Sequence, residues 1–74
     1  MIKNEQERQR IGEVIAAIRK EHGLTQRELA EKVGVSHGHI GRIETGRYTM
    51  RIDTLQRIAD VFNMEIELIK KGEN

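Results

Sequence analysis

Two short helical segments joined by a three-residue turn restrict most strongly what this chain can fold into. The first segment begins at Thr25, where Thr25 and Glu28 have the spacing of a capping box, and it stops at Gly34. The second begins at Ser36 and ends at Gly46, where a left-handed residue is needed. Helices this short are not stable alone. Both must therefore pack against each other and against the rest of the chain.

The spacing of apolar and small residues within these segments predicts how they pack. The positions expected to face inward are Leu29, Ala30, Val33, Ile40 and Ile43. Two short helices that cross at about 90–120° need apolar contact residues, one small residue and a glycine in the turn. Ala30 and Gly34 meet the last two needs. The combination predicts a helix-turn-helix.

Two further helices are expected on either side. From about Asn4 to His22, apolar residues follow a helical spacing, and Gly23 comes directly after. A last helix is expected from about Arg51 to Phe62, with Thr49 as a candidate for its N-cap. The apolar stripes of these two helices are Ile11, Val14, Ile15 and Ile18 in the first, and Ile52, Leu55, Ile58, Ala59 and Phe62 in the second.

The end of the sequence changes its period. In N63-M64-E65-I66-E67-L68-I69, apolar residues alternate with glutamates as in a strand. Because a single strand cannot satisfy its own backbone, the expected partner is the same segment of a second copy, through Met64, Ile66 and Leu68. The alternative is a short fifth helix capped by Asn63. We thus expect an all-α domain over residues 1–63, with four helices or five, and a dimerising tail over 64–74.

Composition limits the class of protein. The chain has 74 residues, no cysteine and a net charge of +1. These features fit one small domain in a reducing, cytoplasmic setting. No apolar run reaches the length of a membrane span. The low net charge argues weakly against nucleic-acid binding. The basic residues are nevertheless gathered in the middle of the sequence: Arg27, Lys32, Arg42, Arg47 and Arg51.

The helix expected after Ser36 contains two glycines, each costing about 1 kcal/mol relative to alanine. At about 100° per residue, Gly38, Arg42 and Thr45 fall opposite the apolar face, with Gly41 at the edge. A bare helix surface can approach another surface closely, and a major groove has the width to admit it. The alternative is that exposed glycines are simply tolerated.

Other classes of function find less support. The sequence has no phosphate-binding loop and no serine, histidine and aspartate set, and it is too short to enclose a cleft, so we expect no enzyme and no cofactor. His37 and His39 diverge by about 200° on a helix, so we expect no metal site. A helix-turn-helix that docks proteins remains an alternative.

The segment from Ile11 to Phe62 resembles the Xre/Cro-type, lambda-repressor-like DNA-binding domains. The resemblance implies a compact all-α domain that binds double-stranded operator DNA, usually as a homodimer, in a bacterium or phage. The tail F62-N63-M64-E65-I66-E67-L68 is similar to the C-terminal strand of antitoxins of the HipB kind. An antitoxin would also bind a toxin protein.

The expected function is a repressor-like regulator that reads a near-palindromic operator through residues 36–45. His37, Gly38 and Arg42 are the candidates for contact with base edges, Arg42 through two hydrogen bonds to a guanine. The candidates for contact with the DNA backbone are Gln26, Ser36, His39, Thr45, Arg47, Tyr48 and Arg51, of which Gln26 is implied by the resemblance. The resemblance also implies a structural ion pair between Arg19 and Glu44.

Overall fold

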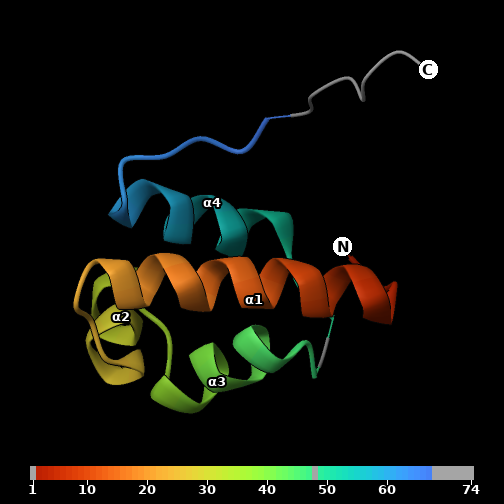
Figure 1. Ribbon diagram of the computed structural model, residues 1–74, viewed down its shortest axis with the longest axis horizontal. Helices are drawn as coiled ribbons and strands as arrows, with labels where there is room; N and C mark the ends of the chain where they lie inside the picture. Colours follow the sequence, from red (N-terminus) through yellow and green to blue (C-terminus); the bar gives the residue numbers. More distant parts are fainter. Residues whose placement is uncertain (1, 48, 68–74) are drawn as a thin grey trace.

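The computed structural model describes residues 2–47 and 49–67, which form four helices. These are α1 (Glu5–Glu21), α2 (Gln26–Val33), α3 (His37–Thr45) and α4 (Ile52–Val61). In Figure 1, α1 runs through the middle, with α4 on one side and α3 on the other. The predicted four-helix, all-α architecture is confirmed.

Helix ends follow the chemistry that the sequence predicts. The Asn4 side chain accepts a hydrogen bond from the Glu7 amide at the start of α1. At the start of α2, the Thr25 hydroxyl accepts from the Glu28 amide at 3.0 Å, and the Glu28 carboxylate accepts from the Thr25 amide at 2.8 Å. This reciprocal pair is the predicted capping box.

The start and end of α4 differ from expectation. Its N-cap is Arg51, which forms no side-chain cap, so the candidate Thr49 is wrong. At its other end, Asn63 adopts a left-handed conformation with φ 57°, and the Met64 amide donates to the Ala59 carbonyl at 2.8 Å. This hydrogen bond satisfies a carbonyl in the last turn of α4. Asn63 therefore ends α4 and does not cap a fifth helix.

The tail has no regular secondary structure as far as it is described. Residues 64–67 are neither helical nor in a strand, and Leu68 lies outside the described residues. Within the described part of the single chain, residues 64–67 thus do not pair with another segment as a strand would.

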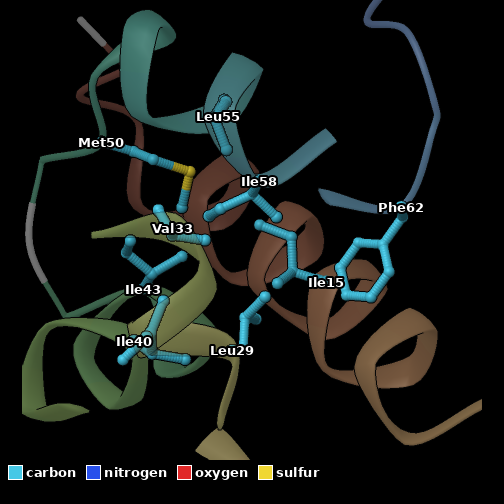
Figure 2. Packing of buried hydrophobic residues seen from close by; sticks show 10 residues of the cluster. Ile15, Leu29, Val33, Ile40, Ile43, Met50, Leu55, Ile58 and Phe62 are labelled. Carbon is cyan, nitrogen blue, oxygen red and sulfur yellow. The ribbon is translucent and has the colours of Figure 1, made fainter. Parts of the chain in front are cut away.

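All four helices and the loop before α4 contribute to one core, shown in part in Figure 2. Its buried apolar members are Ile15, Leu29, Ala30, Val33, Ile40, Ile43, Met50, Leu55, Ile58 and Phe62. Two large residues of the expected stripes stand exposed instead: Val14 is 49% exposed and Ile52 is 53% exposed. Both lie at the edge of the contact between α1 and α4, where nothing in the described chain covers them.

The N-terminal residues hold the loop between α3 and α4. Ile2 and Met50 form an antiparallel bridge, in which the Ile2 amide donates to the Met50 carbonyl at 2.8 Å. The Arg8 guanidinium donates to the Gly46 carbonyl at 3.1 Å. Together these bonds fix the path of the chain after α3. Among the described helices, none has both the length and the apolar character to cross a membrane.

Candidate nucleic-acid interface

The geometry of α3 separates an inner from an outer surface. Ile40 and Ile43 are buried, whereas His37, Gly38 and Arg42 are exposed. Ser36 begins the helix by accepting a hydrogen bond from the His39 amide at 3.2 Å. The three candidates for base contact therefore lie together on the exposed surface of α3.

The two glycines of α3 leave enough room for a β-carbon. A β-carbon at Gly38 would come no closer than 3.7 Å to its nearest neighbour, Nη1 of Arg42. At Gly41 the nearest atom would be Oε1 of Gln26, also at 3.7 Å. These are ordinary contact distances. Packing within the chain therefore requires neither glycine.

A buried ion pair holds α3 against α1. Arg19 donates from Nε to Oε2 of Glu44 at 2.6 Å and from Nη2 to Oε1 at 3.0 Å. The side chains are only 10% and 5% exposed. The hydrogen bond to Glu44 raises the pKa of Arg19 above its ordinary value, so the guanidinium stays charged. Arg19 also donates to the Leu24 carbonyl at 2.8 Å, which ties in the loop before α2.

Gln26 joins this network. Its side-chain amide donates to Oε1 of Glu44 at 3.0 Å, and its Oε1 would lie 3.7 Å from a β-carbon at Gly41. As the first residue of α2, Gln26 also lies at a helix N-terminus, where backbone amides attract an anion. The network therefore places the start of α2 beside the outer surface of α3.

Three of the other candidates for backbone contact interact with neighbouring groups of the chain. The Thr45 hydroxyl donates to the Gly41 carbonyl at 3.0 Å. Nε of Arg51 lies 3.0 Å from Oδ1 of Asp53, in an exposed pair. Burial lowers the pKa of His39 below its ordinary value, and the nearby charges of Arg42 and Arg57 lower it further. In the chain alone, His39 is therefore neutral at pH 7.

The last two candidates follow α3. Arg47 is exposed and follows Gly46, the C-cap of the helix. Tyr48 lies outside the described residues.

Two positioning residues escaped sequence reasoning. Arg57 of α4 donates to the Val33 carbonyl at 2.9 Å, which holds the end of α2. Gly12 of α1 lies so close to α3 that a β-carbon there would be 2.4 Å from the Ile43 carbonyl oxygen. Gly12 falls on the buried side of α1, and a glycine within an amphipathic helix was the available signal.

Comparison with known proteins supports the same fold. The chain is 38% identical over 64 residues to the ImmF control region 10 kDa protein of Bacillus phage phi105, covering 86% of this chain and 71% of that protein. It is 39% identical over 59 residues to the immunity repressor protein of the same phage, covering 80% of this chain and 41% of the repressor.

The chain is also similar to an antitoxin and to a regulator of known structure. The chain is 37% identical over 54 residues to the antitoxin PezA of Streptococcus pneumoniae, covering 73% of this chain and 34% of PezA. The crystal structure of the clp gene regulator ClgR from Corynebacterium glutamicum superposes with a TM-score of 0.74 at 29% identity, over 78% of this chain and 62% of that one. Residues 15–69, which contain α2, α3 and their turn, match the helix-turn-helix family model. This chain belongs to the helix-turn-helix family.

Proposed function

We propose that this chain is a sequence-specific regulator of transcription that binds double-stranded DNA as a homodimer. Helix α3 of each protomer enters the major groove, at two half-sites about 34 Å apart on a near-palindromic operator. The single observation that carries the proposal is the outer surface of α3. It is exposed, it contains two helical glycines that internal packing does not require, and it presents His37 and Arg42.

The proposed contacts divide into two kinds. Arg42, His37 and the bare backbone at Gly38 meet base edges, because they share the exposed surface of α3. The backbone contacts come from both flanks of α3, where they fix register and carry no sequence information. They are Gln26, Ser36, His39, Thr45, Arg47, Tyr48 and Arg51. To bind a phosphate, Arg51 breaks its exposed ion pair with Asp53. This costs little because such surface pairs are weak.

Replacing Arg42 by alanine should relax sequence preference. We expect a loss of about 1–3 kcal/mol of discrimination between operator and scrambled duplex, the worth of one bidentate contact to guanine. The measurement is fluorescence anisotropy at fixed salt, with an operator obtained by selection from random duplexes. As control, Arg47→Ala should weaken both duplexes equally and reduce the salt slope by about one contact. Equal weakening by Arg42→Ala would remove Arg42 from base recognition. No duplex binding even at low salt would favour a protein-docking module.

Replacing Gly38 by alanine should lower operator affinity without lowering the free energy of unfolding. The added methyl group has room in the chain, and alanine favours the helix by up to about 1 kcal/mol, so the free energy of unfolding should stay equal or rise. Operator affinity should fall by about 1–3 kcal/mol, the usual cost of one unaccommodated methyl group in a packed contact. Thermal unfolding and anisotropy on the same samples check both. Unchanged affinity would mean that α3 does not approach DNA at Gly38.

The dimer is proposed to form through the tail. Met64 and Ile66 are each 45% exposed, and with Leu68 they follow the alternation of a strand that needs a partner. A chain ending at Asn63 should sediment as a monomer and bind single half-sites only. An unchanged mass would remove the tail from the dimer.

A second candidate is an antitoxin, favoured by the similarity to PezA. An antitoxin of this kind would bind its own operator through the same α3 surface and, in addition, a toxin protein. A toxin-like gene next to the one that encodes this chain would favour this candidate over a free-standing repressor.

A further inference from the structure

One guanidinium of α1 ties the end of α3 to the first residues of the chain. Nε of Arg8 donates to the Gly46 carbonyl at 3.1 Å, and Nη1 of Arg8 donates to the Lys3 carbonyl. The backbones also approach closely here, since a β-carbon at Gly46 would lie 2.8 Å from the amide nitrogen of Gln9. The chain that leaves α3 is therefore fixed to α1 at Gly46.

A second contact fixes the same segment where it reaches α4. The Ile2 amide donates to the Met50 carbonyl at 2.8 Å, and the Met50 amide donates to the Ile2 carbonyl at 3.3 Å. The side chain of Met50 lies in the core, where the residue is 2% exposed. Figure 1 shows the N-terminal end of α1 beside the chain that leads from α3 to α4. Residues 46–50 are thus held at both ends by residues 2–8.

Each of the two held positions directly precedes an arginine. Arg47 follows Gly46 and Arg51 follows Met50, and both arginines are exposed. Both are proposed above to contact phosphates. Fixing the backbone of a flexible residue opposes binding, whereas a segment that is already ordered in the free chain avoids this cost. Hydrogen bonds at Gly46 and Met50 therefore favour the phosphate contacts of the arginines that follow them.

We propose that Arg8 and Ile2 are positioning residues for DNA binding. They contact no DNA themselves, and they hold Arg47 and Arg51 where these side chains meet phosphates. Both residues precede the segment that matches the helix-turn-helix family model, residues 15–69, so membership of the family does not supply this arrangement. The inference rests on the proposed function and deepens it, since it names what orders two of the phosphate contacts.

The first test follows the segment in the free chain. In Arg8→Ala, the Met50 amide should exchange its hydrogen about tenfold faster, the equivalent of losing about one hydrogen bond. Circular dichroism should not change, because Arg8 lies outside the apolar core. Arg10→Ala removes the same charge from an exposed position of α1 and should leave the exchange of Met50 unchanged. Equal exchange in the intact chain and Arg8→Ala would overturn the inference.

The second test measures duplex affinity by fluorescence anisotropy. Arg8→Ala should weaken the operator and the scrambled duplex alike, by about tenfold, since the contacts it orders go to phosphates. The slope of affinity against salt should fall by about one contact. Arg10→Ala should change affinity by less than about twofold, because salt screens a distant exposed charge.

A double-mutant cycle separates positioning from direct contact. When Arg47→Ala and Arg51→Ala are already present, Arg8 has no side chains left to position. Adding Arg8→Ala to that chain should then weaken binding by less than about twofold. A further tenfold loss would show that Arg8 binds DNA itself, and would overturn the inference.

Failure of this inference can be distinguished from failure of the proposed function. If the intact chain binds neither duplex at low salt, the proposed function fails and the inference fails with it. If the intact chain binds but a folded Arg8→Ala binds equally well, the inference fails alone. Should Arg8→Ala unfold, Ile2→Pro decides in the same way. It removes the amide that donates to Met50, keeps an apolar side chain, and should cause the same loss of affinity.

Discussion

Replacing Glu44 by alanine is expected to lower the free energy of unfolding by about 3–5 kcal/mol, the usual cost of breaking a buried ion pair. The carboxylate accepts two hydrogen bonds from Arg19 and one from Gln26. Without it, the guanidinium of Arg19 keeps its charge but loses its partner in a site that is 10% exposed. Because domains of this size have little stability to spare, we expect a large unfolded fraction at 37 °C.

Urea unfolding followed by circular dichroism measures this loss, and the sequence offers a matched control. Glu7→Ala removes the partner of Arg10 in a pair whose side chains are 52% and 67% exposed, so it should cost at most about 1 kcal/mol. The double variant Arg19→Met, Glu44→Leu removes both charges and should recover most of the loss. If Glu44→Ala were no more costly than Glu7→Ala, the pair would not hold α3 in place.

Local chemistry explains how much of the fold the sequence predicts. Capping side chains act within three residues, and the left-handed glycines act within one turn of helix, so the ends of α1, α2 and α3 follow from short stretches. The inner face of α3 follows from the spacing of Ile40 and Ile43 alone. The exposed surface of α3 follows in turn, since it is what remains opposite these two residues.

Contacts between distant segments could not be predicted in this way. Periodicity shows that Val14 and Ile52 share a stripe with core residues, but it does not show how far the neighbouring helix reaches. The bridge from Ile2 to Met50 joins two segments that carry no strand pattern. Arg57 is exposed by its position on α4, yet it reaches the last carbonyls of α2. Each of these depends on the packing of whole helices.

The close approach of α1 and α3 at Gly12 has the second large consequence. In Gly12→Ala, the new β-carbon would lie 2.4 Å from the Ile43 carbonyl oxygen and 2.6 Å from that of Glu44. Both are backbone atoms at the end of α3, so no side chain can rotate away to make room. Overpacking of this kind costs about 1–3 kcal/mol and occasionally more, whereas the gain in helix propensity is only about 1 kcal/mol. Because both contacts are much shorter than real β-carbon contacts, the cost lies at the upper end of that range, and we expect a net loss of about 2 kcal/mol.

Gly41→Ala is the matched control, because it makes the same change within a helix where the nearest atom would be 3.7 Å away. It should raise the free energy of unfolding by up to about 1 kcal/mol, so the two substitutions should move the urea midpoint in opposite directions. In Gly12→Ala, α3 must shift away from α1, and Glu44 moves with it. The variant should therefore also weaken the Arg19 pair, and its cost should not add to that of Glu44→Ala. Equal stability of Gly12→Ala and the unchanged chain would show that α1 and α3 are not in contact at this point, and additive losses would show that Gly12 and the ion pair act independently.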